Sequence, residues 1–124
     1  MTATIPPEKM EQYRRTARKR ESEQKQAMAR RRESAWLVAR QAASLLKEQF
    51  GATRVVVFGS LAHGAWFHAR SDIDLMVAGI PPEKFWRAWA ALDQVSDGFE
   101  IDLVTDLELT ERLRAAIERE GVEL

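Results

Sequence analysis

The chain has 124 residues and a formal net charge of zero, and 45% of its residues are hydrophobic. That length bounds it to one domain of moderate core size, with the hydrophobic content of a globular protein. It has no cysteine, which excludes disulfides and thiolate zinc sites. With neither an apolar N-terminal signal segment nor an apolar run of about 18 residues, it is expected to be cytoplasmic and not associated with a membrane.

The zero net charge conceals two oppositely charged halves. Residues 1–50 contain 12 Lys and Arg against 6 Asp and Glu, whereas residues 51–124 contain 7 against 13. A local excess of carboxylates favours cation binding, and a basic segment favours acidic partners. The second half of the chain is therefore the half that favours cation binding.

The first expected element is a long helix over residues 7–50. This segment has no glycine and no proline after Pro7, and it is rich in Glu, Gln, Lys, Arg, Ala and Met, which favour helices. Pro7 suits a first turn and Gly51 a stop, so the helix would extend for about 60 Å. An apolar stripe at helical spacing is expected to pack on a sheet: Ala35, Val38, Ala42, Leu45 and Leu46.

Residues 1–33 are expected to form a basic helical extension, and residues 34–124 a folded domain. The apolar residues of the extension are too sparse to bury much surface, and its arginines cluster at positions 14–20 and 30–32. This helix either remains solvated or docks on nucleic acid, on a partner protein, or on the acidic half of a second copy. Because Tyr13 is the only aromatic residue among the basic residues of 1–33, sequence-specific nucleic-acid binding is not favoured.

A short strand followed by a Gly-Ser turn begins the folded domain. Residues 55–58 are β-branched or aromatic and predict a buried strand that ends at Gly59. Gly59 allows a ligand to approach the backbone closely, and Ser60 can cap a short helix from Leu61 to about Trp66. The free N–H groups and the hydroxyl would face an anion, as in one half of a triphosphate site.

Three aspartates predict a site for a divalent cation. Asp72 and Asp74 lie two apart at the start of a strand expected over residues 72–78, so strand alternation puts both carboxylates on one face. Asp102 belongs to a segment at 99–104 in which apolar and acidic residues alternate. Mg²⁺ takes oxygen ligands and combines one or two carboxylates with substrate phosphates, and a third carboxylate would complete a two-metal site.

Each of these features also has an ordinary structural interpretation. Gly-Ser turns commonly follow strands, aspartates often serve as turn residues, and Asp102 could lie on a solvated strand face. Two acids that face one way on an apolar strand nevertheless need compensation by a cation. Arg70, just before the second strand, is a candidate ligand for a phosphate.

The remaining elements predict an α/β (α+β) fold. After Pro81 and Pro82 a helix is expected over residues 83–95, followed by the strand at 99–104 and a last helix over 107–120. Because helices and strands alternate along the chain, we expect a small mixed β-sheet with helices packed on one face, preceded by the long N-terminal helix. The acidic residues would lie at one edge or end of this sheet.

Residues 59–60, residues 71–75 and Asp102 resemble the signature of the DNA polymerase β-type nucleotidyltransferase superfamily. The small size resembles its minimal nucleotidyltransferase branch, whose members are often paired with a HEPN-domain partner in toxin–antitoxin modules. The likeness covers roughly residues 35–124, and it implies a polymerase β-like nucleotidyltransferase core for the domain expected at 34–124.

The resemblance implies a role for each residue of the motif. In that family the Gly-Ser turn, here Gly59 and Ser60, holds the triphosphate. The first two aspartates bridge two Mg²⁺ ions, and the third helps to bind one ion and to activate the attacking hydroxyl. Those roles fall on Asp72, Asp74 and Asp102.

The resemblance further implies a Mg²⁺-dependent transfer of a nucleoside monophosphate, AMP when ATP is the donor, to a hydroxyl of a macromolecular acceptor. The expected acceptor is a tyrosine of a HEPN-type toxin, which would make the chain an antitoxin that adenylylates its partner. Two alternatives stay open: a non-catalytic antitoxin that binds through the long basic helix, and a nucleic-acid end-modifying nucleotidyltransferase. A homo-oligomer formed through that helix is compatible with each.

Overall fold

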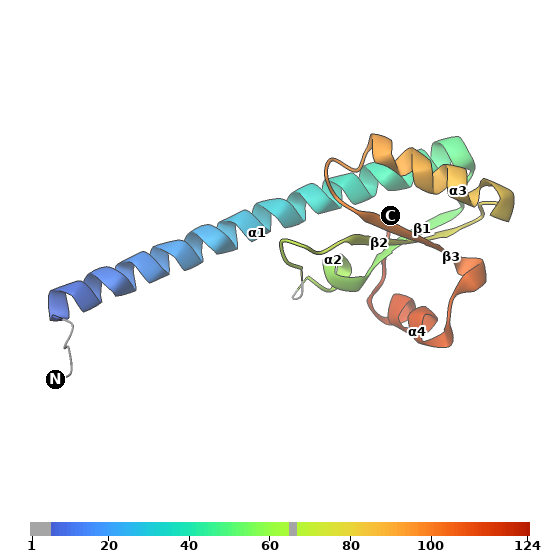
Figure 1. Cartoon of the computed structure of the whole chain (residues 1–124). Helices are drawn as coiled ribbons and strands as arrows, with labels where there is room; N and C mark the ends of the chain where they lie inside the picture. The colour runs from blue at the N-terminus through green and yellow to red at the C-terminus, as the bar shows by residue number, and fades with distance from the viewer. Residues whose placement is uncertain (1–5, 65–66) are drawn as a thin grey trace.

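The structure is a computed structural model that describes residues 6–64 and 67–124. In chain order its elements are α1 (Pro7–Phe50), β1 (Arg54–Phe58), α2 (Gly59–His63), β2 (Ile73–Ala78), α3 (Pro82–Ala91), η1 (Leu92–Gln94), β3 (Ile101–Thr105), η2 (Asp106–Glu108), α4 (Glu111–Glu120) and β4 (Val122–Glu123). Figure 1 shows a small domain built around the sheet, with α1 projecting far beyond it. The expected α/β class, the mixed sheet and the long N-terminal helix are confirmed.

The helix α1 is uninterrupted over 44 residues. Pro7 occupies its first turn, and Gly51 ends it in the left-handed conformation at φ 73°. Its second half packs on the sheet through buried residues from Ala35 to Leu46, whereas its first half is largely exposed. The division into an extension, 1–33, and a folded domain, 34–124, stays a prediction because α1 crosses that boundary without a break.

The sheet has the strand order β3-β2-β1-β4. β1 is antiparallel to β2 and β4, whereas β2 and β3 are parallel. As a result, the C-terminal end of β1 and the N-terminal ends of β2 and β3 lie at the same end of the sheet. The register places Asp74 beside Phe58 on one side and beside Asp102 on the other. The segments predicted to hold a phosphate and a cation are therefore adjacent in space.

Helices cover both faces of the sheet, which corrects the expectation of packing on one face (Figure 1). The larger core lies between α1, α3 and the sheet and includes Leu75 and Leu103. The smaller core lies under α4 and includes Met76. Since Asp74 and Asp102 alternate with the two leucines along their strands, both carboxylates lie on the face that α4 covers.

Several element boundaries differ from those expected. α2 begins at Gly59 instead of Leu61, and the expected end of this helix, Trp66, lies outside the described residues. α4 begins at Glu111, later than expected, because the 3₁₀ turn η2 follows β3. β4 is an additional strand, which pairs with β1 and is followed by Leu124, whose N–H donates to the Val55 C=O at 2.9 Å.

We expect the second half of α1 to be essential for the stability of the domain. Leu46 is fully buried in the larger core, so Leu46→Ala should lower the free energy of unfolding by about 3 kcal/mol. Leu37 lies on the same helix but is 53% exposed, so Leu37→Ala should change that free energy by less than about 0.5 kcal/mol. Urea denaturation of both variants measures the difference. Equal effects would contradict the packing of α1 on the sheet.

Candidate active site

The candidate site lies at the end of the sheet where β1 finishes and where β2 and β3 start. Asp74 is half-buried within β2 and pairs with Asp102, which is exposed on β3. Asp72 is also exposed and lies just before β2 instead of within it. The Ile73 N–H donates to the Glu100 C=O at 2.9 Å, which holds the starts of the two strands together. The structure thus brings the three predicted carboxylates to the same region.

The environment of Asp74 disfavours its negative charge. Burial, then the charge of Asp102 and that of Asp72, raise the pKa of Asp74 from 3.8 to about 6. All three causes act in the same direction. A cation bound here would offset the repulsion between the carboxylates, so the electrostatics of this cluster favour cation binding.

The three carboxylates do not by themselves form a complete set of metal ligands. Within residues 6–64 and 67–124, no three His, Cys, Asp or Glu side chains are arranged so that they could hold a metal ion together. The oxygen donors of Asp72, Asp74 and Asp102 nevertheless have the chemistry that Mg²⁺ prefers, and Mg²⁺ commonly completes its shell with water and substrate phosphates. The donor set fits Mg²⁺ in the company of a nucleotide.

Gly59 lies directly against the carboxylate of Asp74. Its φ is 71°, a left-handed conformation, and a Cβ at this position would overlap Oδ2 of Asp74. Glycine is the residue that combines this conformation with this close approach. The turn predicted to hold a phosphate therefore adjoins the carboxylates predicted to hold a metal.

Ser60 is not the helix cap that the sequence predicted. α2 starts at Gly59, the residue at its N-cap position is Phe58, and no side chain caps it. Ser60 lies in the first turn, and its C=O accepts a hydrogen bond from the Gly64 N–H at 2.8 Å. The first N–H groups of a helix have no intrahelical acceptor, so those of α2 point out of the helix at the same end of the sheet as Asp74.

The turn that leads into β2 depends on Ser71, a structural role that no sequence pattern indicated. Ser71 is buried, its N–H donates to the His68 C=O at 3.0 Å, and its Oγ accepts from the His68 N–H at 2.9 Å. These bonds position Asp72. Arg70 lies in the same turn with an exposed side chain, and its guanidinium forms no ion pair in the described part of the chain. Its predicted role as a phosphate ligand stays a prediction.

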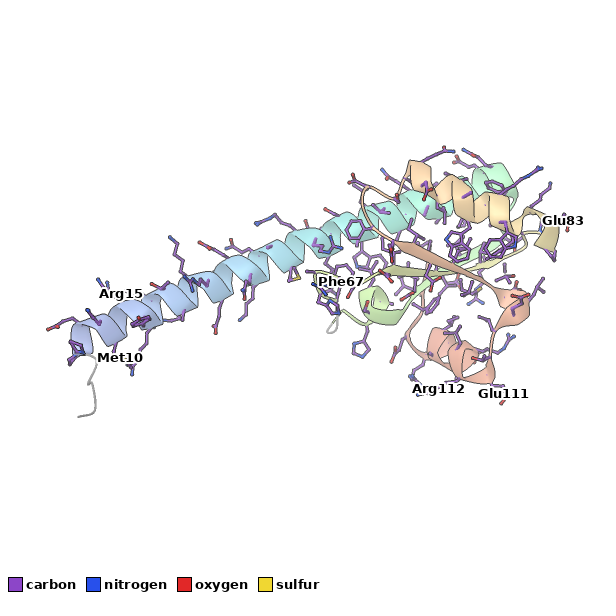
Figure 2. The ribbon with its side chains drawn as sticks, viewed as in Figure 1. Met10, Arg15, Phe67, Glu83, Glu111 and Arg112 are labelled. Atoms are coloured by element: carbon purple, nitrogen blue, oxygen red, sulfur yellow. The ribbon has the colours of Figure 1, made fainter. Side chains whose placement is uncertain are left out.

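Two arginines of α1 also contact this end of the domain. The Arg31 guanidinium carbon lies 4.4 Å from the centroid of the Phe99 ring, a cation–π contact just before β3. Arg32 lies against Gly64 at the end of α2, where a Cβ would overlap its guanidinium. Figure 2 shows Phe67 of the adjoining loop beside this part of α1. A run of arginines predicts an exposed helix face, so these contacts could not be predicted from the sequence.

The raised pKa of Asp74 predicts that Asp74→Asn stabilises the fold. A carboxyl whose pKa is higher in the folded protein than in the unfolded chain destabilises the folded state once it ionises. The variant should therefore gain about 1 kcal/mol at pH 7, a value reduced for solvent screening at a half-exposed group. This gain should decline as the pH falls below about 6 and vanish below the ordinary pKa of 3.8. Urea denaturation between pH 3.5 and 8 tests this, with the exposed Asp93→Asn as a control that should show no such trend.

A Gly-Ser turn lies against clustered carboxylates at the end of a small mixed sheet, an arrangement that suits chemistry on phosphate groups. The nucleotidyltransferase domain family matches residues 39–124, and the chain belongs to this family. A solved structure of a protein assigned as a minimal nucleotidyltransferase is 34% identical, with a TM-score of 0.56, and the match covers 80% of this chain and 94% of that protein. The minimal type of nucleotidyltransferase expected from the motif is confirmed.

Two solved toxin–antitoxin structures share the fold. One is a mutant of the MntA–HpeT complex and the other contains AMP-PNP; both are 22% identical to this chain, with TM-scores of 0.56 and 0.58. The matches cover 68% of this chain and 69% and 70% of those chains. A search of the curated proteins gives no match. None of the described helices is both long and apolar enough to cross a membrane.

Proposed function

We propose that this chain is a Mg²⁺-dependent nucleotidyltransferase that transfers AMP from ATP to a hydroxyl of a macromolecular acceptor. The contact between Gly59 and the Asp74 carboxylate carries the proposal, because it unites the phosphate turn and the carboxylates in one site. Membership of the nucleotidyltransferase family supports the class of reaction. The AMP-PNP in one matched toxin–antitoxin structure supports ATP as the donor.

In this proposal Asp72, Asp74 and Asp102 hold Mg²⁺ together with phosphate oxygens of the nucleotide. The raised pKa of Asp74 reflects a repulsion that a cation would offset. When bound, Mg²⁺ polarises the phosphoryl group and neutralises its charge. Another matched MntA–HpeT structure carries Glu substitutions at two aspartates that lie two positions apart, the spacing of Asp72 and Asp74 here.

The groups of the chain itself then position the reactants. The N–H groups at the start of α2 and the Arg70 guanidinium would hold the β- and γ-phosphates. The acceptor oxygen attacks the α-phosphorus, a new O–P bond forms, and the bond from the α-phosphorus to the oxygen that bridges to the β-phosphate breaks. Pyrophosphate leaves, and the proton of the acceptor hydroxyl passes to the exposed Asp102 carboxylate, which acts as the general base.

The acceptor in this proposal is a tyrosine hydroxyl of a HEPN-type toxin, so that the chain acts as the antitoxin of a cytoplasmic pair. The motif of residues 59–60, 72–74 and 102 supports this assignment through its resemblance to minimal nucleotidyltransferases. The toxin–antitoxin structures that share the fold support it further.

A second candidate function is a non-catalytic antitoxin that binds its partner through α1. The observation in its favour is the exposed half of this helix, where residues 6–27 are all exposed and carry the first arginine cluster. Figure 2 shows side chains such as Met10 and Arg15 projecting from a helix that no other described element covers there. Such a surface fits an acidic protein, a second copy of the chain, or the backbone of a nucleic acid in an end-modifying enzyme.

Transfer of label from ATP separates these functions. We expect label from α-labelled ATP, but not from γ-labelled ATP, to appear on one component of a host lysate in the presence of Mg²⁺. The double variant Asp72→Asn, Asp74→Asn should abolish the signal. A partner that remains bound without label from either nucleotide would instead support the non-catalytic antitoxin. Label on RNA or DNA, with a steep salt dependence, would support the end-modifying enzyme.

A further inference from the structure

The strand β3 has an unpaired edge next to the candidate site. β3 is the outermost strand and pairs with β2 alone. Alternate residues of β3 and of the segment just before it direct their N–H and C=O groups toward β2, and the bond from the Ile73 N–H to the Glu100 C=O shows that Glu100 is one of them. The residues between, Ile101, Leu103 and Thr105, therefore direct these groups away from β2. The Ile101 C=O accepts a hydrogen bond from Trp89 Nε1 at 2.9 Å. In the described part of the chain, the N–H and C=O of Leu103 have no partner at this edge.

An apolar groove of about 620 Å³ follows this edge, between α3 and the turn η2. The Trp86 and Trp89 rings stack in it, with centroids 5.4 Å apart and planes at 11°. Trp86 is 71% exposed, and Leu107 on the other side of the groove is 67% exposed. Large exposed apolar side chains that flank unpaired strand groups are typical of a surface that binds an extended peptide.

The groove connects the two faces of the sheet. Leu103 points toward α3 and its aromatic side chains, whereas Asp102 and Val104 point toward the face of the candidate site. An extended segment paired with β3 would follow the same alternation. Its residue opposite Leu103 would meet Trp86, and the neighbouring residue opposite Asp102 would lie beside that carboxylate.

We propose that the free edge of β3 binds an extended polypeptide segment of the acceptor by strand addition. The segment places an apolar side chain against Trp86 and the hydroxyl of a neighbouring Ser, Thr or Tyr beside Asp102. The charge of the groove favours a polypeptide over a nucleic acid, because its lining includes Asp102 and Glu108 but no Lys or Arg. This inference rests on the proposed transferase function and specifies how the acceptor is recognised.

The first test uses a library of synthetic peptides, each with one Ser, Thr or Tyr, labelled by the chain with α-labelled ATP and Mg²⁺. Among labelled peptides we expect an apolar residue next to the modified one. Methylation of single backbone nitrogens should abolish labelling at every second position and be tolerated at those between, because only alternate N–H groups face β3. Tolerance at all positions, or loss at all of them, would overturn strand addition.

Variants of the chain provide the second test. Trp86→Ala and Leu107→Asp should each lower peptide labelling by about tenfold or more through a higher KM. Leu37→Asp introduces the same charge at an exposed leucine outside the groove and should leave labelling unchanged. Equal labelling by the Trp86→Ala variant and the unmodified chain would overturn the proposal.

Calorimetric titration with Mg²⁺ and AMP-PNP distinguishes a failure of the strand-addition proposal from a failure of the proposed transferase function. If the nucleotide binds but no peptide is labelled, or only RNA is labelled, strand addition is overturned while the transferase site stands. If the nucleotide does not bind, the proposed function itself fails, and the inference about β3 fails with it.

Discussion

Replacing Asp102 by Asn should lower the rate of nucleotidyl transfer by about a thousandfold and leave nucleotide binding nearly unchanged. Asp102 is exposed on β3 and pairs with Asp74, so its carboxylate is placed to accept the proton of an incoming hydroxyl. An amide at this position cannot take the proton. In the proposed site the turn at Gly59 holds the triphosphate on the other side of Asp74, and Asp72 and Asp74 remain to hold Mg²⁺, so nucleotide binding should persist.

Initial rates with α-labelled ATP and the labelled acceptor measure the first effect, and titration with Mg²⁺ and AMP-PNP measures the second. Glu100→Gln is the matched control, because Glu100 is an exposed acid two residues earlier, outside β3. We expect its rate to stay within about threefold of the unmodified chain. A rate for Asp102→Asn in that same range would show that another group accepts the proton.

Gly59→Ala should have the second large effect, on both stability and activity. Alanine at φ 71° carries a conformational cost of about 1–2 kcal/mol, and its Cβ would also overlap the Asp74 carboxylate. Either the turn or the carboxylate must move. Because both belong to the proposed site, we expect transfer to fall by about a hundredfold or more.

Gly98→Ala separates the two causes. Gly98 also has a positive φ, 83°, but a Cβ there would meet no atom within 4 Å. It should show the conformational cost alone, measured by urea denaturation, with transfer largely unchanged. If Gly59→Ala and Gly98→Ala lowered activity equally, the close approach of Gly59 to Asp74 would have no role in the reaction.

Local patterns were sufficient to predict most of the elements and the placement of two carboxylates. Three features depend only on residues that are close together in the chain, so they can be read directly from the sequence. They are the β-branched run at 55–58, the helix-favouring segment at 7–50 and the strand alternation around Asp74 and Asp102. The family match to residues 39–124 agrees with the motif that these elements position.

Long-range features could not be predicted in the same way. The amphipathic pattern of α4 shows that one side is buried, but it does not tell which face of the sheet receives it. β4 contains two exposed residues, too few for any periodicity to appear. Ser60 looked like a cap because the helix was expected two residues later, and the left-handed conformation of Gly59 within the first turn has no local signal.

Because α1 is one continuous helix, the packing of its second half on the sheet also fixes the direction of its exposed half and the side of the axis on which each exposed residue lies. Each residue turns a helix by about 100° and advances it by about 1.5 Å. Deleting one residue from the exposed half would swing every upstream side chain to another side of the axis, whereas deleting seven would shorten the helix by about 10 Å and nearly restore the original direction. The count of residues between the sheet and the arginine clusters is therefore itself a structural parameter, which sets how far from the site, and on which side of it, positive charge is presented.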